Sequence, residues 1–319
     1  MRVLIVKLSS MGDVISTLPA VTDATKAISG IKFDWVIEEN FSEIPRWHQA
    51  VDSIVPIALR RWRKKLFCLS TSKEVRIFWQ KLKAEKYDYI LDVQGLLKSA
   101  VVAKIACGTS YGFDVTCARE PLAAYFYQNK FNIPRSLHAV ERSRQLFAKA
   151  LGYKITTDVL DYGLIKERFV GKEGKISTGK YLVFIHGASR SKKCWQEKKW
   201  IELAGLAKKE GFKVKLPWGN NEELVRANNI ARGSDNVEVL SKSTLTELGA
   251  ILLGANGVVA LDTGLSHLSA ALSVPAVSLY GPTDPNLAGT YGKNQAHLTN
   301  MENLSAEDVW SKMVTIFCT

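Results

Sequence analysis

Residues that could carry chemistry gather between positions 261 and 285 of this 319-residue chain, in the segment LDTGLSHLSAALSVPAVSLYGPTDP. An apolar strand is expected to end here, to turn through Thr263 and Gly264, and to continue as a helix from about Ser266. The start of a helix favours an anion, because unpaired backbone N–H groups and the positive end of the helix dipole meet there. The hydroxyls of Thr263 and Ser266 and the imidazole of His267 add donors. The pattern predicts a diphosphate site at the carboxyl end of a parallel sheet.

The same segment allows a structural interpretation. Strand, turn and helix follow one another in every parallel α/β domain, and a glycine after a strand is common. His267 is also compatible with a buried histidine that has only structural contacts. The added serine and histidine, and the G-P-T-D-P loop at 281–285 after the next strand, favour ligand binding.

Asp13 is a second candidate, in the loop that follows the first predicted strand. Loops at this position of α/β proteins bind ligands, and a carboxylate there could accept a proton from a substrate hydroxyl. Aspartate is also a favoured helix N-cap, and the residues alone leave both interpretations open. Ser9, Ser10 and Gly12 make a loop of small residues that lets a substrate approach the backbone. The loop is not G-x-G-x-x-G, so no dinucleotide cofactor is indicated.

Two further loops of the second half follow predicted strands. The segment HGASRSKKCW at 186–195 contains Lys192 and Lys193, and a lysine near the anion site could neutralise a departing diphosphate. A solvated lysine pair is the alternative. In PWGNNEE at 217–223, Glu223 could hold ribose hydroxyls, as an acidic residue does in nucleotide-binding folds. Glu222 is placed equally well.

The net charge of +12 is unevenly distributed. Between Arg60 and Lys86 there are ten Lys and Arg against two acidic residues, a net +8, interleaved with Trp62 and other aromatics. Such a segment fits a nucleic acid, an anionic membrane surface or a polyanionic substrate, and for 73–86 a solvated helix face is the alternative. Because no nucleic-acid module accompanies it, we expect no nucleic-acid partner.

Composition describes an ordinary globular protein, 46% hydrophobic and 23% charged. The five cysteines show neither a C-x-x-C pair nor zinc-ligand spacing, which is typical of a reducing compartment. No D-x-D motif occurs where a metal would bridge a diphosphate, so we expect neither a metal nor a cofactor. No stretch approaches the ~18 apolar residues of a membrane span. The sequence predicts a cytoplasmic protein.

Alternating apolar runs and helix-period segments must position these residues, and they indicate parallel α/β construction. At roughly 100–200 residues per domain, the chain should form two domains. A glycine-rich shift at 161–180 marks the linker. Strands are predicted at 3–7, 33–39, 52–58 and 87–93 in the first half, and at 181–186, 257–262 and 276–280 in the second, with further strands in FKVKLPW and VEVL.

Three helices carry specific expectations. A helix is predicted over 14–28, although Pro19 suggests a start closer to Thr17. The segment 136–152 has helical spacing with a glycine stop and closes the first domain. The helix at 305–317 begins with a Ser-x-x-Asp cap and could pack on either domain.

Two pairs of segments, one member in each half of the chain, have similar sequences. ILDVQGLLKSAVVA at 90–103 is similar to VALDTGLSHLSAAL at 259–272, and VLIVKLSS at 3–10 is similar to LVFIHGAS at 182–189. Such echoes support fold rather than function. Two Rossmann-like domains are the simplest organisation.

At this point several segments together resemble glycosyltransferase family 9, over nearly the whole chain. RRWRKK and AREPLA narrow the likeness to members that add the first heptose of the lipopolysaccharide core. The segments are MRVLIVKLSSMGDVISTLPAV at the start, RRWRKK near 60, D-x-Q-G-L-x-K-S at 92–99, TCAREPLA at 116–123, LPWG at 216–219, and LDTGLSH with YGPTDP near the end.

The resemblance implies a GT-B fold, with two Rossmann-like domains and an active site between them. It implies an acceptor-binding domain at 1–165 and a domain at 178–300 that binds ADP-heptose, with the helix at about 305–319 returning to the first. The acceptor would be lipid A bearing 3-deoxy-manno-octulosonic acid (Kdo), at the cytoplasmic face of the inner membrane. We expect a monomer and an inverting transfer.

Site residues carry over by matching motif positions. Asp13 matches the general base proposed for the family. Ala188 stands where similar enzymes often have a hydroxyl, which leaves Ser189 for donor contacts, and Trp195 aligns Lys193 rather than Lys192 with the diphosphate. Donor-site positions are Ser189, Lys193, Glu223, Asp262, Thr263, Gly264 and His267. Acceptor-site positions are Arg60, Arg63, Lys64, Arg119 and His138.

Two rivals remain open. Another transferase of the family, such as the one that adds the second heptose, would share the LDTGLSH segment but need an acceptor that already carries heptose. A non-catalytic protein that binds nucleotide-sugar and anionic lipid would need no Asp13.

Overall fold

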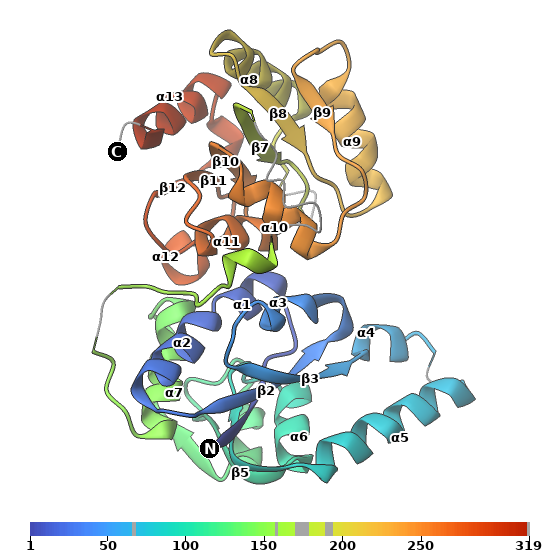
Figure 1. The fold of residues 1–319 in the computed structure, drawn as a ribbon, viewed down its shortest axis with the longest axis vertical. Coiled ribbons are helices and arrows are strands. Elements are labelled where there is room, and N and C mark those ends of the chain that lie inside the picture. The colour runs from blue at the N-terminus through green and yellow to red at the C-terminus, as the bar shows by residue number, and fades with distance from the viewer. Residues whose placement is uncertain (66–67, 157–158, 170–178, 189–193, 318–319) are drawn as a thin grey trace. The chain divides into compact units, whose positions relative to one another are not determined.

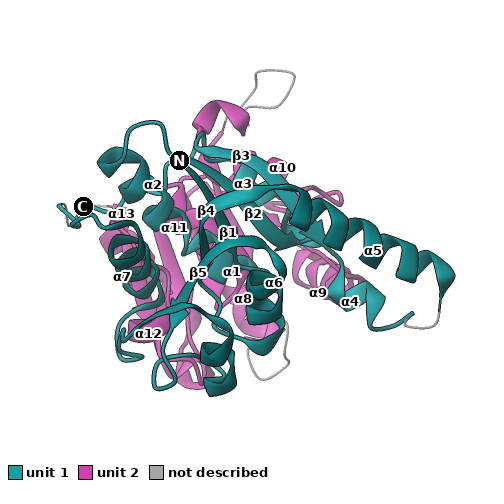
Figure 2. Ribbon diagram, turned by 90° about the horizontal axis from the view of Figure 1, so that it is seen from below, with its two compact units in different colours: residues 1–164 teal, residues 165–319 magenta. Residues whose placement is uncertain are grey.

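A computed structural model describes residues 1–65, 68–156, 159–169, 179–188 and 194–317. The chain divides into two compact units, Met1–Leu164 and Ile165–Thr319, which Figure 2 shows in different colours. Each unit contains one six-stranded sheet in which every strand pair is parallel. The predicted α/β class is therefore confirmed (Figure 1).

The sheet of the first unit has the order β3-β2-β1-β4-β5-β6, which is the order of dinucleotide-binding Rossmann folds. The four predicted strands are present. Two strands were missed, because CGTSYGF is polar and glycine-containing and NKF is only three residues long. The strands are β1 Arg2–Val6, β2 Lys32–Glu38, β3 Val51–Ile57, β4 Lys86–Asp92, β5 Cys107–Phe113 and β6 Asn129–Phe131.

The helices of this unit differ from prediction at one place. The helix expected over 14–28 is two helices, and Pro19 is the second residue of the later one, where its missing N–H costs nothing. The last helix ends at Gly152, whose φ of 76° is the left-handed cap that glycine supplies. The helices are α1 Met11–Ile15, α2 Leu18–Ala27, α3 Glu43–Arg46, α4 Leu59–Trp62, α5 Leu69–Ala84, α6 Leu97–Ile105 and α7 Ala139–Leu151, with 3-10 turns η1 Glu39–Phe41 and η2 Pro121–Phe126.

One face of this sheet is covered by α4, α5, α6 and η2. Apolar strand residues such as Leu4 and Val6 join Phe78 and Leu82 of α5 and Ala103 of α6 in a single buried core. The helices α2 and α7 pack against each other, and α7 contacts β4 and β5. The carboxyl ends of all the strands share one edge, where loops are free to carry function.

The sheet of the second unit has the order β12-β11-β10-β7-β8-β9, the same order counted from β7. This explains the internal echo, because β4–α6 and β10–α11 occupy equivalent places, as do β1 and β7. The strands are β7 Tyr181–Ile185, β8 Lys213–Leu216, β9 Val237–Val239, β10 Gly257–Leu261, β11 Ala276–Leu279 and β12 Gln295–Leu298. The helices are η3 Lys166–Arg168, α8 Glu197–Lys209, α9 Asn221–Ala231, α10 Leu245–Leu253, α11 Gly264–Ala271, α12 Pro285–Ala288, η5 Met301–Asn303 and α13 Ala306–Phe317.

The last helix, α13, begins as its sequence predicted. Ser305 N and Oγ both donate to Asp308, at 2.9 and 2.7 Å, and Asp308 N donates back to Ser305 Oγ at 3.1 Å. The helix packs on α8, β10, β11 and β12 of its own unit, with Val309 and Met313 fully buried in that core. This differs from the expected return of the helix to the first domain. Its apolar stripe predicted burial but did not specify the partner.

Within the described residues, no helix is long and apolar enough to cross a bilayer.

Candidate functional site

Asp13 lies in the first turn of α1, directly after the loop that leaves β1. Ser10 is the N-cap, and Asp13, three residues later, accepts a hydrogen bond from Ser10 N at 3.0 Å and from Ser10 Oγ at 2.7 Å. Asp13 is therefore the acidic member of a capping box rather than the N-cap itself. Its side chain keeps about a quarter of its surface exposed (25%), so the carboxylate still faces solvent.

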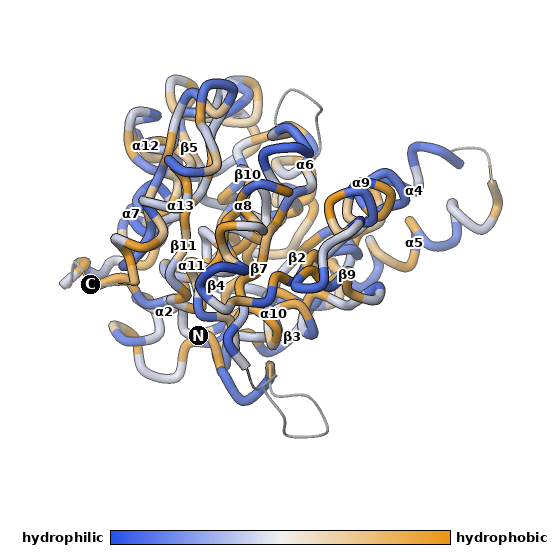
Figure 3. The backbone as a smooth tube through the Cα atoms, turned by 90° about the horizontal axis from the view of Figure 1, so that it is seen from above, coloured by the Kyte–Doolittle hydropathy of each residue, from blue (hydrophilic) through white to orange (hydrophobic). Residues whose placement is uncertain are grey.

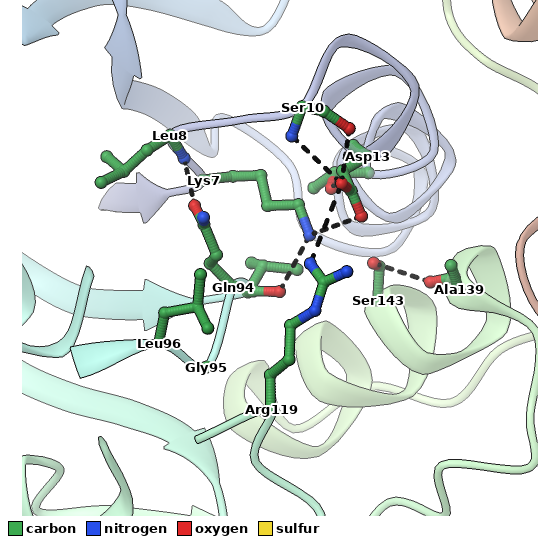
Figure 4. A network of polar contacts seen from close by, with 12 residues as sticks. Lys7, Leu8, Ser10, Asp13, Gln94, Gly95, Leu96, Arg119, Ala139 and Ser143 are labelled. Carbon is green, nitrogen blue, oxygen red and sulfur yellow. Dashed lines mark hydrogen bonds and ion pairs between the residues drawn. The ribbon is translucent and has the colours of Figure 1, made fainter. Parts of the chain in front are cut away.

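Lys7 places a buried positive charge beside this carboxylate (Figure 4). Its Nζ lies 3.6 Å from Asp13 Oδ1 and donates to Val93 O at 3.3 Å. Burial lowers the pKa of Lys7, although Asp13 opposes that shift. Burial by itself would raise the pKa of Asp13, but the charge of Lys7, the two bonds from Ser10 and the charge of Arg119 outweigh it and lower the pKa to about 2. Asp13 is ionised at any physiological pH.

Arg119 reaches the same carboxylate from the loop that follows β5. Its Nη1 is 4.0 Å from Asp13 Oδ2, and its side chain is half exposed, which leaves donors for a ligand. The backbone of this loop is fixed by its neighbours: Glu120 N donates to Gly95 O at 2.9 Å, and Leu97 N donates to Glu120 Oε2 at 2.6 Å. Gly95 has a φ of 66°, and a Cβ there would lie 3.2 Å from Arg119 N. Glycine is therefore needed at this point of the D-x-Q-G-L segment.

Asp92 and Gln94 organise this segment from inside. Asp92, at the end of β4, accepts hydrogen bonds from Gln94 N, Gly95 N and Tyr127 Oη at 2.9, 3.1 and 2.7 Å. Gln94 Oε1 in turn accepts from Leu8 N at 2.7 Å, which joins the β4 loop to the β1 loop. Sequence reasoning quoted this segment as a motif but assigned no role to Asp92, Gln94 or Lys7. The sequence did contain a signal for these residues, because Lys7 directly follows β1, and Asp92 and Gln94 lie at the end of β4.

In the basic cluster RRWRKK at 60–65, one arginine forms ion pairs within the protein, and the other charged side chains are available to a ligand. Arg61 forms ion pairs with Glu39 and Glu74 at 3.1 and 2.9 Å, so its role is structural. Arg60 donates its backbone N–H to Glu38 Oε1, and its guanidinium lies over the ring of Phe41. Arg63 and Lys64 are exposed and form no ion pair with a described residue. The three predicted acceptor contacts of this cluster all have an available charge, and so does the exposed Lys65.

His138 has a structural explanation that the sequence did not supply. It is the N-cap of α7, where its Nδ1 accepts a hydrogen bond from Val140 N at 3.2 Å, and it is buried. A contact with acceptor is still a prediction for this residue.

The predicted anion site of the second unit lies at the start of α11. Thr263 is the N-cap and Gly264 the first helical residue. Thr263 Oγ1 is buried and has no hydrogen-bond partner among the described residues. A buried hydroxyl without a partner is costly, and a phosphate oxygen bound at this helix start would satisfy it. Thr263 is thus the residue whose geometry points most directly to an anionic ligand.

Neighbouring residues of this turn have internal bonds. Asp262 Oδ2 accepts from Thr283 Oγ1 at 2.7 Å, which joins the turn to the G-P-T-D-P loop. Ser266 Oγ donates to Thr263 O at 2.6 Å, so the expectation that Ser266 offers its hydroxyl to a ligand is wrong. His267 is buried on α11. A hollow of about 750 Å³ opens beside this loop, lined by Pro282, Trp195 and Asn300 among others.

Glu223 lies between two loops at the carboxyl edge of the second sheet. Its Oε2 accepts from Gly219 N at 2.7 Å, and a Cβ at Gly187 would lie only 2.5 Å from its Cδ. Glycine at 187 thus lets this carboxylate lie against the backbone after β7. Glu222 is exposed at the surface. The structure brings Glu223, rather than Glu222, to the edge where ligands bind.

His186, at the end of β7, was overlooked because it follows an apolar strand without a motif. Its imidazole is fully buried, and burial together with the charge of Arg226 lowers its pKa to about 4. The loop that follows contains two predicted donor contacts, Ser189 and Lys193, as well as Lys192. All three lie outside the described residues.

Among the described residues, no group of three or more His, Cys, Asp or Glu side chains is arranged to hold a metal ion.

Comparison with known proteins gives a family match over most of the chain. The model of glycosyltransferase family 9 (heptosyltransferase) matches residues 75–313. Lipopolysaccharide heptosyltransferase 1 of Escherichia coli (strain K12) is 49% identical over 321 residues, covering 99% of this chain and 100% of that protein.

Solved structures agree. The E. coli heptosyltransferase WaaC with ADP has a TM-score of 0.93 and 47% identity, covering 99% of this chain and 100% of the other. The same enzyme with ADP-2-deoxy-2-fluoro heptose has a TM-score of 0.90, 47% identity, and 99% coverage of both chains. The predicted fold class, two Rossmann-like domains of GT-B type, is confirmed.

Proposed function

The chain belongs to glycosyltransferase family 9, the heptosyltransferases, and from this membership we propose its substrates and the roles of its residues. It is a heptosyltransferase of lipopolysaccharide inner-core biosynthesis. The donor is ADP-L-glycero-D-manno-heptose, and the acceptor is a Kdo residue of Kdo-lipid A. The 49% identity to lipopolysaccharide heptosyltransferase 1, over nearly the full length of both chains, supports transfer of the first heptose over transfer of the second.

The second unit binds the donor. The diphosphate lies at the start of α11, where it accepts from Thr263 Oγ1 and from the first N–H groups of the helix, beginning with Gly264. Glu223 holds ribose hydroxyls. Lys193, with Ser189, neutralises charge on the departing diphosphate, because that charge grows as the glycosidic bond breaks. Asp262 and His267 position the turn.

The first unit binds and activates the acceptor. Asp13 accepts the proton of the Kdo hydroxyl as that oxygen attacks the anomeric carbon of heptose, opposite the leaving ADP, with inversion. A carboxylate with a pKa of about 2 is a weak base, so the proton transfers late, when the attacking oxygen has become acidic through bond formation. The charges of Lys7 and Arg119 keep Asp13 ionised, and the two hydrogen bonds from Ser10 hold its carboxylate in position.

Basic residues orient the acceptor. Kdo carries a carboxylate and lipid A carries phosphates, which match the available charges of Arg60, Arg63 and Lys64 and the half-exposed Arg119. His138 completes this set. The protein acts as a monomer at the cytoplasmic face of the inner membrane, without a metal or cofactor.

The unpartnered Thr263 hydroxyl at the start of α11 supports this function most directly, and one assay tests it. ADP release from ADP-heptose is measured with and without Kdo-lipid A, and the product is analysed for heptose on Kdo. Acceptor-dependent release establishes the first transfer. Release only with an acceptor that already bears heptose reassigns the protein to the second transfer. Tight ADP binding without release from either acceptor indicates a non-catalytic nucleotide-sugar and lipid binding protein.

A further inference from the structure

Three neighbouring elements of the first unit expose apolar side chains to solvent. Leu69 and Ile77 of α5 are 90% and 51% exposed, Val101 of α6 is 36% exposed, and Leu122 and Tyr125 of η2 are 61% and 72% exposed. The helix α6 packs against both α5 and η2, and all three cover the same face of the sheet. We call their outer surface the α5–α6 face. Exposed aliphatic and aromatic side chains gathered in one layer indicate an interaction surface rather than scattered surface residues.

The α5–α6 face is also basic. Its three acidic groups are already bonded. Glu74 pairs with Arg61 and accepts from Trp62 Nε1 at 2.8 Å. Glu85, at the end of α5, pairs with Arg2 at 2.9 Å, and Glu120 accepts from Leu97 N. Exposed cations lie on the same helices as the apolar side chains or beside them, and they form no ion pair with a described residue. These cations are Lys73, Arg76, Lys81 and Lys83 of α5, Lys98 and Lys104 of α6, and Lys130 of β6.

The helices α2 and α7 of the same unit provide an internal contrast. Two of their cations form ion pairs: Lys26 pairs with Asp161 at 2.6 Å, and Arg144 pairs with Asp23 at 2.6 Å and with Glu141 at 3.1 Å. The other two, Arg142 and Lys149, donate to the backbone carbonyls of Cys117 and Asn132. Each cation of α2 and α7 thus has a polar partner within the unit.

Aromatic residues line a groove in this face. It has a volume of about 610 Å³ and lies along α5, with Trp62, Val75 and Trp79 on its walls and Arg76 and Lys83 on its rim. The half-buried indole of Trp79 stacks edge-on against Phe78 at 4.8 Å. Indole rings partition to the boundary between headgroups and acyl chains. In Figure 3 the tube of α5 alternates between hydrophobic and hydrophilic colours, as expected of a helix that lies in such a boundary.

We propose that the α5–α6 face binds the surface of an anionic bilayer, with α5 lying in the headgroup region. This deepens the proposed function, because α4, which carries Arg60, leads directly into α5 and would hold the acceptor headgroup at the same surface. Lys73, Arg76 and Lys83 attract anionic lipid, while Leu69 and Ile77 enter the interface. A bilayer is favoured over a nucleic acid because the cations surround aliphatic side chains, which a phosphate backbone would leave in water.

Vesicle flotation of the full-length protein tests the proposal without any transfer reaction. Vesicles of phosphatidylcholine alone are compared with vesicles that also contain phosphatidylglycerol. We expect binding to the anionic vesicles only, and weaker binding as salt rises. Equal binding to both vesicles, or binding to neither, would overturn the proposal.

Two variants with matched controls locate the surface. K73E/R76E should weaken anionic-vesicle binding about 30-fold or more, since each basic side chain contributes roughly fivefold at such a surface. K198E/K209E on α8 makes the same charge change elsewhere and should bind at least tenfold better than K73E/R76E. L69S/I77S should weaken binding roughly tenfold, whereas I201S/V225S, which removes exposed aliphatic side chains from α8 and α9, should not.

Thermal melting confirms that each variant is folded, and transfer to a deacylated, water-soluble Kdo acceptor separates this proposal from the proposed function. We expect K73E/R76E and L69S/I77S to transfer heptose to that acceptor at the wild-type rate while failing to bind vesicles. Vesicle binding by these folded variants equal to that of their controls would show that the surface lies elsewhere. If the wild-type protein bound anionic vesicles but transferred no heptose, the proposed function would be contradicted and the membrane-binding proposal would stand.

Discussion

The ammonium group of Lys7 lies 3.6 Å from Oδ1 of Asp13, and both residues flank the loop between β1 and α1. Lys7 is buried, so its charge acts on the carboxylate through a medium that screens it weakly. The pair explains why Asp13 stays ionised although it lies at the edge of the core.

Replacing Asp13 by Asn should lower the transfer rate by roughly 10²–10⁴-fold, the usual range for losing a general base. ADP affinity should not change, because the proposed ADP site lies in the second unit. Steady-state kinetics and ADP titration measure the two effects. Asp52→Asn removes an exposed carboxylate of β3 and serves as the control. Near-normal turnover of D13N would exclude Asp13 as the base.

Replacing Lys7 by Met should raise the pKa of Asp13, since loss of an adjacent opposite charge shifts a carboxyl by about one to three units. In the wild type the pKa of Asp13 is about 2, so the carboxylate stays ionised across the working pH range and the acid limb of kcat/KM is set by other groups. In K7M, the rate should begin to fall at a higher pH. A pH profile of kcat/KM tests this, with Lys26→Met as a surface control. An acid limb identical to that of wild type would contradict the electrostatic role of Lys7.

Replacing Thr263 by Val should weaken ADP binding by roughly 10–100-fold, the range for a hydrogen bond to a charged group. Stability should be unchanged or higher, because the free protein offers this buried hydroxyl no described partner. Calorimetric titration and thermal melting measure the two quantities. Ser278→Ala removes another buried hydroxyl, from within β11, and should leave ADP binding intact. Equal ADP affinity of T263V and wild type would remove Thr263 from the donor site.

Replacing Glu223 by Gln should weaken donor binding roughly tenfold or more, because a charged acceptor for ribose hydroxyls is lost. Glu222→Gln is the matched control, one residue away on the same helix and exposed, and it should bind the donor normally. Competition between ADP and ADP-heptose measures both affinities. If E222Q were the weaker binder, the assignment between these neighbours would have to be reversed.

Acid should destabilise the second unit through His186. The pKa of its imidazole is about 4 in the folded chain, below the ordinary value of 6.5, so the unfolded chain binds more protons between these limits. Stability from the neutral imidazole is complete above pH 6.5 and lost as the pH falls toward 4, about 3 kcal/mol in all. Denaturant unfolding at several pH values should show this slope, and His186→Asn should flatten it. A slope that persists in the variant would assign the proton uptake to another group.

The sequence predicted the strands that form the centre of both sheets, because runs such as VLIVK and GVVALD are continuous and apolar. It failed where local composition conflicts with tertiary context. β5 contains Gly108 and Gly112 and resembles a loop, yet its residues 107–111 pair with β4 and its residues 111–113 pair with β6. Gly112 is required there because a Cβ would lie 2.4 Å from the ring of Tyr127, a contact that no local pattern reveals.

Where a motif directly follows a strand, as at Asp13 and Thr263, the structure places the residue at the start of the next helix, and its role in the reaction stays a prediction. Site prediction missed Lys7 and Gln94, whose roles depend on residues about 86 positions away in the chain. It also offered Ser266 to a ligand although that hydroxyl caps its own helix. Side-chain direction within a turn follows from backbone geometry, which spacing alone does not determine.

The shared strand order of the two sheets has an evolutionary consequence. Each unit buries its own apolar core, so a substitution that reshapes one set of loops does not require the other sheet to repack. In the proposed function, the acceptor and the activated sugar are thus recognised by two units that each have their own core. Selection can exchange one specificity while it keeps the other, and a family built in this way can lengthen a glycan one residue at a time by varying half a chain.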